Sequence, residues 1–200
     1  MTALFETREE WLQAASVELR SVMLAETGLT IPNVRVGVGF TSGGLRTNEL
    51  GQTWARKASK DGINEITVRV TVNDPVDVLA VLGHELIHAA LDCKGAHGKT
   101  FTRAHLAMGY VSDSKGCMLG AELREAYAAL TEALGDYPGD DGLAVAAMKK
   151  KQTTRMRKCT CVTCGFTFRT TARWIADRAL ECPDVECDGA VLVSTDEGSE

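Results

Sequence analysis

Hydrophobic and polar residues alternate with two different periods along the first half of the chain. Residues 6–27 place apolar side chains three or four positions apart and are followed by Gly28, which predicts an amphipathic helix. Valines at 34, 36 and 38 alternate with other residues and predict a short strand. Residues 65–72 predict a second strand, with aliphatic residues on one face and polar residues such as Arg69 on the other.

A longer helix is predicted after the second strand. Asp74 can cap its first turn, Pro75 suits the first helical position, and the apolar stripe continues to about Cys93. Residues 99–108 and 121–134 have helical spacing as well. This order of elements predicts an α+β fold, with a small sheet packed beside the helix that begins at Pro75.

Changes in composition mark the ends of the folded parts. The stretch 135–142 is rich in glycine and aspartate and predicts the end of the first domain. A basic stretch follows, then most of the cysteines, then an acidic end. The predicted parts are a first domain at 1–135, a basic linker at 136–158, a cysteine domain at 159–193 and an acidic disordered tail at 194–200.

The net charge of -5 at pH 7 conceals three blocks of different sign. Residues 1–148 contain 13 basic and 19 acidic residues, residues 149–180 contain nine basic residues and one acidic residue, and residues 181–200 contain seven acidic residues and no basic ones. A polyanion is therefore expected to bind the middle block. The composition, 44% hydrophobic and 24% charged, is that of a globular protein. Neither a membrane span nor a secretory signal is expected, so we expect a cytoplasmic protein.

One motif with metal-binding chemistry lies on the predicted long helix. The chain reads His84-Glu85-Leu86-Ile87-His88, an HExxH motif. The two histidines are four positions apart, so they lie one turn apart on one helix face and can share a zinc ion. Glu85 is placed to act as a general base on a water molecule at that ion.

A catalytic zinc site normally has three protein ligands, so a third is expected. His97 is the strongest candidate, because the chain can turn back toward the helix after Gly95. His105, Asp92 and Glu122 are the alternatives, and Asp92 can also serve as a hydrogen-bond acceptor for an imidazole.

Five of the seven cysteines fall between positions 159 and 187. In a reducing compartment such a cluster indicates a metal site rather than disulfides. The predicted ligands of a structural zinc are Cys161, Cys164, Cys182 and Cys187, with Cys159 as an alternative to Cys161. A segment with so few large apolar residues needs such a metal to fold.

Basic residues accompany aromatic residues around the cysteine cluster, which suits phosphate contact combined with base stacking. The alternative is a solvated basic linker without a partner. The predicted nucleic-acid contacts are Lys149, Lys150, Lys151, Arg155, Arg157, Lys158, Arg169 and Arg173.

The stretches 83–90 and 96–101, which read GHELIHAA and AHGKTF, resemble the SprT-like metalloprotease family, to which Spartan belongs. The resemblance covers about residues 35–110 and extends to the cysteine domain, and it is strongest to compact bacterial and phage members. It implies a zincin-like domain followed by a zinc ribbon. It further implies a catalytic zinc on His84, His88 and His97, and Glu85 as the catalytic acid and base. The host cytoplasm would be the compartment if the protein is encoded by a phage.

The chain is accordingly predicted to be a zinc-dependent endopeptidase with one catalytic and one structural zinc. By resemblance, its substrates would be proteins bound or cross-linked to DNA, recruited through the basic linker and the ribbon. The alternative is a non-catalytic DNA-binding zinc protein that acts in transcription or recombination. Zinc-dependent hydrolysis of a non-protein substrate is a third option.

Overall fold

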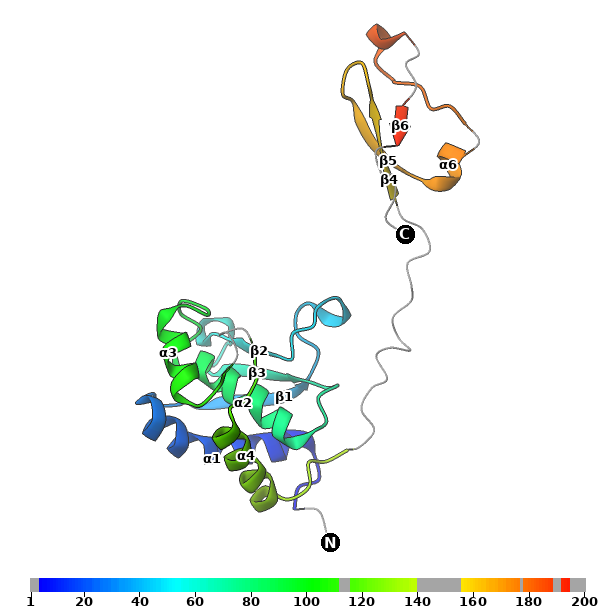
Figure 1. Cartoon of the computed structure of the whole chain (residues 1–200). Helices are drawn as coiled ribbons and strands as arrows, with labels where there is room; N and C mark the ends of the chain where they lie inside the picture. Colours follow the sequence, from blue (N-terminus) through cyan, green and yellow to red (C-terminus); the bar gives the residue numbers. More distant parts are fainter. Residues whose placement is uncertain (1–3, 112–115, 140–155, 177, 189–191, 195–200) are drawn as a thin grey trace. The chain divides into compact units, whose positions relative to one another are not determined.

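The structure is a computed structural model of the whole chain, and it describes residues 4–111, 116–139, 156–176, 178–188 and 192–194. The chain forms two compact units, Met1–Met148 and Lys149–Glu200 (Figure 1). Both units combine helices with small sheets, which confirms the predicted α+β class. Among the described residues, no helix is both long enough and apolar enough to cross a membrane.

The first unit has a three-stranded sheet with the order β1-β3-β2. β1 pairs with β3 in parallel and β2 pairs with β3 in antiparallel orientation, so β2 is an edge strand among the described residues. Its elements are α1 (Arg8–Thr27), β1 (Val34–Gly39), η1 (Gly44–Arg46), β2 (Gly51–Trp54), η2 (Arg56–Ala58), β3 (Asn64–Arg69), α2 (Pro75–Ala90), α3 (Lys99–Ala107) and α4 (Ala121–Leu134).

Helix α2 is the central element of this unit. It contacts β2, β3 and the other three helices, and most of its residues are buried. A helix that is apolar nearly all round is stable only inside such a core. As predicted, Asp74 caps it, accepting a hydrogen bond from the Asp77 N–H, and Pro75 opens it. The core thus holds the helix that carries the HExxH motif.

Two of the predicted boundaries are wrong. The helix ends at Ala90 rather than near Cys93, and the second strand ends at Arg69 rather than at position 72. Arg69 is buried, not outward-facing, because its guanidinium donates to the carbonyl oxygens of Thr47 and Glu49 at 2.7 and 3.0 Å. A buried cation needs such hydrogen bonds, and periodicity alone does not reveal them.

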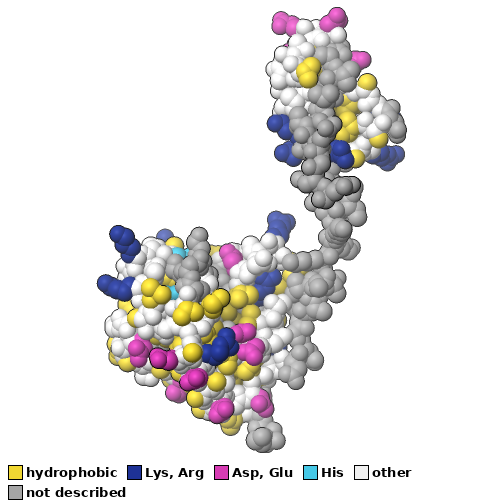
Figure 2. All heavy atoms as spheres, viewed as in Figure 1, with side chains coloured by type: hydrophobic (Ala, Val, Ile, Leu, Met, Phe, Trp, Pro, Cys, Tyr) yellow, Lys and Arg dark blue, Asp and Glu magenta, His cyan; other side chains and the backbone are white. Residues whose placement is uncertain are grey.

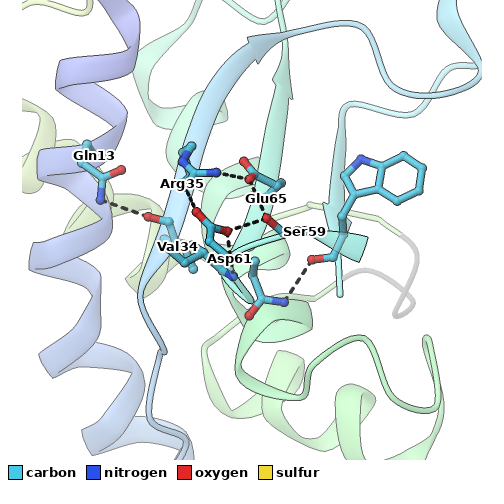
Figure 3. A network of polar contacts seen from close by, with 9 residues as sticks. Gln13, Val34, Arg35, Ser59, Asp61 and Glu65 are labelled. Carbon is cyan, nitrogen blue, oxygen red and sulfur yellow. Dashed lines mark hydrogen bonds and ion pairs between the residues drawn. The ribbon is translucent and has the colours of Figure 1, made fainter. Parts of the chain in front are cut away.

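A polar network covers the outer part of β1 and β3 (Figure 3). Arg35 and Glu65 are directly opposite each other in the register and form an ion pair. Arg35 also pairs with Asp61 at 2.5 Å, and Ser59 donates to Asp61 at 2.7 Å. The Ser59 hydroxyl and then the Arg35 guanidinium lower the pKa of Asp61 to about 2. The network fixes the turn between η2 and β3 against the sheet.

The second unit has a small antiparallel sheet with the order β5-β4-β6. Its elements are β4 (Met156–Cys161), β5 (Thr167–Thr171), α6 (Ala172–Ala176), η3 (Val185–Cys187) and β6 (Leu192–Ser194). Its buried cluster consists of the cysteines Cys159, Cys161, Cys182 and Cys187, and three partly buried apolar side chains pack against them. The apolar residues are Phe168, Ile175 and Leu180.

Candidate functional site

The structure brings the three predicted histidine ligands together. His84 and His88 project from consecutive turns of α2, and His97 follows seven residues after the helix ends. The Nε2 atom of His97 lies 3.2 Å from that of His88 and 3.3 Å from that of His84. Nitrogen atoms bound to one tetrahedral zinc ion are about 3.3 Å apart, as follows from a bond length of about 2.0–2.1 Å. The donor set therefore fits a metal ion such as zinc.

The loop that presents His97 has an unusual backbone. Asp92, Cys93 and Ala96 have φ values of 50°, 56° and 43°, and Gly95 has a φ of 75°. Three non-glycine residues in this sparsely populated region cost about 1–3 kcal/mol each. Asp92 holds the loop to η2, because its carboxylate accepts the Arg56 N–H at 2.9 Å. The surrounding contacts thus impose the conformation that turns His97 back toward α2.

The alternative third ligands do not join this group. His105 is fully buried beneath the site, where its ring stacks on Tyr110 and its Nε2 lies 3.0 Å from the Gly116 carbonyl oxygen. Asp92 is engaged with Arg56, and Glu122 is exposed in the first turn of α4. Of the four candidates, only His97 joins His84 and His88.

Burial keeps the imidazoles of α2 uncharged. Burial first, and then the neighbouring histidines, lower the pKa of His84 to about 3 and that of His88 to about 4. Neutral imidazole is the form that binds a metal. The fold therefore presents His84 and His88 as ready ligands at neutral pH.

Glu85 lies beside the histidines and is nearly inaccessible to solvent, with 5% of its surface exposed. The Thr53 hydroxyl, on edge strand β2, lies 2.8 Å from Glu85 Oε2 and 3.0 Å from the Glu85 carbonyl oxygen. Burial raises the pKa of Glu85 to about 7, although the Thr53 hydrogen bond opposes this. A carboxyl group with such a pKa is poised both to accept and to release a proton near neutral pH.

Gly51 allows β2 to approach the helix this closely. A Cβ atom at Gly51 would lie 2.7 Å from both Glu85 Oε1 and Val81 Cγ1. Next to this contact a groove of about 730 Å³ lies between Leu50, which precedes β2, the β3–α2 connection, α2, and the segment that leads into α4. Its walls include Leu50, Val72, Ala80, Val81, Cys117 and Met118.

The second unit brings Cys161, Cys164, Cys182 and Cys187 together, and Cys159 stays outside this group. The sulfur atoms are 3.9 Å apart for Cys161 and Cys187 and 3.5 Å apart for Cys164 and Cys182. Four sulfurs on a tetrahedral zinc would be about 3.8 Å apart, given a bond length of about 2.3 Å. The four thiols thus also fit a metal ion.

The first cysteine pair forms a tight turn around its sulfurs. Gly165 has a φ of 76°, and the Phe166 N–H then points at Cys164 Sγ, 3.4 Å away. Backbone N–H groups, first that of Cys164 and then that of Thr163, lower the pKa of Cys161 to about 6. The pKa of Cys187 is raised, chiefly by Cys164, because crowded thiols resist several negative charges. A bound cation would relieve this repulsion.

Four of the predicted nucleic-acid contacts are among the described residues, and all four are exposed on the second unit. Lys158 and Arg169 are directly opposite each other on β4 and β5. The other two described contacts are Arg157 and Arg173, whereas Lys149, Lys150, Lys151 and Arg155 lie outside the described residues.

Comparisons with protein-family models, with curated proteins and with solved structures gave no match. The function must therefore be argued from the two sites. Reasoning from the sequence did not single out Thr53 or Gly51 for the contacts that they make with Glu85. Both residues lie on β2 itself, and the sequence does not indicate which of the side chains of this strand faces the helix.

Proposed function

We propose that this chain is a zinc-dependent endopeptidase of the SprT-like type, with a zincin-like first unit and a zinc ribbon as its second unit. One observation carries the proposal: the Nε2 atom of His97 lies 3.2–3.3 Å from those of His84 and His88, beside a buried carboxyl group whose pKa is about 7. A surface histidine cluster would have neither the buried acid nor the supporting strand.

A zinc ion on the three imidazoles would supply a Lewis acid and lower the pKa of water at the site. His84, His88 and His97 would hold that ion. Glu85 takes a proton from the attacking water at one carboxylate oxygen and later passes it to the leaving amine. Thr53 fixes the other oxygen, Oε2, through its 2.8 Å hydrogen bond.

Edge strand β2 and the adjoining groove suit an extended peptide. Among the described strands β2 pairs only with β3, so its outer edge can accept an added strand through backbone hydrogen bonds. Leu50 is 44% exposed at the wall of the groove and can contact an apolar substrate side chain. Backbone pairing of this kind selects flexible protein segments rather than one sequence.

The second unit supports a nucleic-acid-associated substrate. The guanidinium of Arg178 lies 4.7 Å from the centre of the exposed Trp174 ring, and Lys158 and Arg169 lie opposite each other on the hairpin. Such surfaces bind phosphates and stack on bases. We therefore propose that the substrates are proteins bound or cross-linked to DNA. We place the protein in the cytoplasm, because zinc on cysteine thiolates suits a reducing compartment.

The test uses the variants Glu85→Gln and His97→Ala in the full chain. Glu85→Gln should keep two zinc ions per chain and lose at least about 100-fold in cleavage of a DNA-bound protein, the usual contribution of a general base. His97→Ala should lose one zinc ion and the same activity. Measurements are zinc content by mass spectrometry and cleavage followed by gel electrophoresis.

Undiminished cleavage by Glu85→Gln would overturn the assignment of the base. DNA binding without cleavage by the wild type at any zinc loading would favour the second candidate, a non-catalytic DNA-binding zinc protein. The exposed basic and aromatic residues of the second unit are the observation that keeps this candidate open.

A further inference from the structure

Charge is divided unevenly over the described part of the first unit. The segments 56–61 and 92–103 contain six basic and two acidic residues. The remaining described residues of the unit contain six basic and 14 acidic residues. The two acidic residues within the segments are already paired, Asp61 with Arg35 and Asp92 with Arg56. The described part of the unit is thus acidic as a whole, whereas these two segments together are positive.

The other five cations of these segments are exposed, and none forms an ion pair within the described residues. We call them the basic rim. They are Lys57, Lys60, Lys94, Lys99 and Arg103.

Three residues of the basic rim adjoin the histidine site, and Arg103 lies farther along α3, beside Glu26 and Thr27 at the end of α1. Lys94 and Lys99 flank His97 in sequence, and the Arg56 N–H bond to Asp92 holds η2, which carries Lys57, against the His97 loop. Lys99 and Arg103 are four residues apart on α3 and therefore share one helix face. In Figure 2, dark blue atoms lie near the cyan histidines at the upper left of the first unit, and most magenta atoms of this unit lie on its lower face, where dark blue atoms occur as well.

The first turn of α3 has the opposite charge from that of the other long helices. α1, α2 and α4 begin with acidic residues, which stabilise the positive end of a helix. α3 begins with Lys99, and it has neither an acidic residue in its first turn nor a side-chain cap. This arrangement disfavours the helix by itself, but it leaves N–H groups and a lysine that can bind an anion.

We propose that the basic rim contacts the phosphate backbone of nucleic acid, so that the face carrying the histidine site lies against the nucleic acid. Four of its five residues are lysine, which is depleted in protein–protein interfaces and suits phosphate contact without sequence preference. The consequence for substrates, cleavage close to the nucleic-acid surface, rests on the proposed function. The binding itself does not depend on catalysis.

The experiment measures the affinity of the full chain for a fluorescent DNA duplex of about 25 base pairs between 50 and 200 mM salt. All proteins carry Glu85→Gln, so that cleavage plays no part. Lys99→Gln/Arg103→Gln is compared with Arg46→Gln/Arg124→Gln, which removes two exposed cations outside the rim. Equal zinc content and near-ultraviolet circular dichroism establish that each variant is folded.

The rim variant should lower the slope of log affinity against log salt by about 1.8, since each lost phosphate contact contributes about 0.9. The control variant should leave the slope unchanged. Equal slopes for the rim and control variants would overturn the proposal, as would a rim variant that lost affinity for polyglutamate but not for DNA. Another outcome is that the rim variant lowers the salt slope as expected while the chain with Glu85 restored cleaves no DNA-bound protein. In that case the proposed function is wrong, and the proposal that the basic rim binds nucleic acid is retained.

Discussion

The two candidate metal centres differ in what surrounds them. The histidine site is built on a core of 27 buried hydrophobic residues among those described, eight of them on α2. In the second unit the buried cluster is the four cysteines Cys159, Cys161, Cys182 and Cys187, three of them in the candidate metal site. In the first unit a hydrophobic core holds the candidate ligands in place, whereas in the second unit the candidate ligands are themselves most of the buried cluster.

Under the proposed function, this difference suits different roles for an ion at each site. A site built on a complete core can lose its metal and keep its geometry, which suits a metal that takes part in chemistry. A site that replaces a core contributes its binding energy directly to folding. The neutral imidazoles of His84 and His88 and the strained His97 loop agree with the first role, because the core maintains both without an ion.

Removal of both ions with a strong chelator should separate the two units most clearly. The second unit should unfold, since structural zinc on cysteines contributes about 10–16 kcal/mol. The first unit should stay folded. Hydrogen exchange checks this: amides of β4 and β5 should lose protection, and amides of α2 and β3 should keep it.

Single cysteine variants provide the matched control. Cys161→Ser should reproduce the loss of protection in the second unit. Cys159→Ser should keep the zinc, since Cys159 is buried but is not one of the four candidate metal ligands. Retained protection of β4 and β5 after chelation would mean that the apolar contacts of Phe168, Ile175 and Leu180 suffice. The contrast between the two centres would then disappear.

Features whose residues lie close together in the sequence could be predicted, and contacts between residues far apart in the sequence could not. The HExxH spacing is local, and the cap at Asp74 and Pro75 is local too, so both could be read directly. The burial of Arg69 depends on carbonyl oxygens 20 and 22 residues away, and the link from Thr53 to Glu85 spans 32 residues. Side-chain periodicity carries no information about such contacts.

The His97 loop shows the same limit. Gly95 indicated a turn, but the left-handed conformations of Asp92, Cys93 and Ala96 are imposed by contacts with η2 and β2. The sequence did not predict the basic rim either, because its residues come from two segments that are more than 30 residues apart in the chain. Only the fold brings three of them to one site.

The pH dependence of the metal-free first unit tests whether its fold alone maintains the site. His84 and His88 have folded pKa values of about 3 and 4 against 6.5 in the unfolded chain, so below pH 6.5 the unfolded state binds more protons there. Stability contributed by these two groups is therefore lost as the pH falls. Glu85, raised from 4.5 to about 7, has the opposite effect, because the folded state holds its proton.

The two histidines outweigh the single glutamate. Linkage gives a net loss of about 1.5 kcal/mol in unfolding free energy between pH 7 and pH 5. Without the opposing glutamate, Glu85→Gln should lose about 3.7 kcal/mol over the same range. Urea unfolding followed at α2 amides measures both values. A stability that rises on acidification would show that the metal-free fold does not keep these imidazoles buried.

The smallest expected effect concerns the hydrogen bond by which β2 orients the base. Thr53→Val keeps the shape but removes the hydroxyl at 2.8 Å from Glu85 Oε2, and Thr53→Ser keeps the hydroxyl. A hydrogen bond to a charged group contributes about 1.5–3 kcal/mol, so kcat should fall roughly tenfold or more in the valine variant and little in the serine variant. The pKa of Glu85 should also rise, because the Thr53 hydrogen bond lowers it, and the acidic limb of the kcat profile should move to higher pH. Zinc content should be unchanged in both variants. Equal kcat for Thr53→Val and the wild type would contradict this role of the hydroxyl. Packing against Gly51 and Val81 would then be enough to position the carboxylate of Glu85.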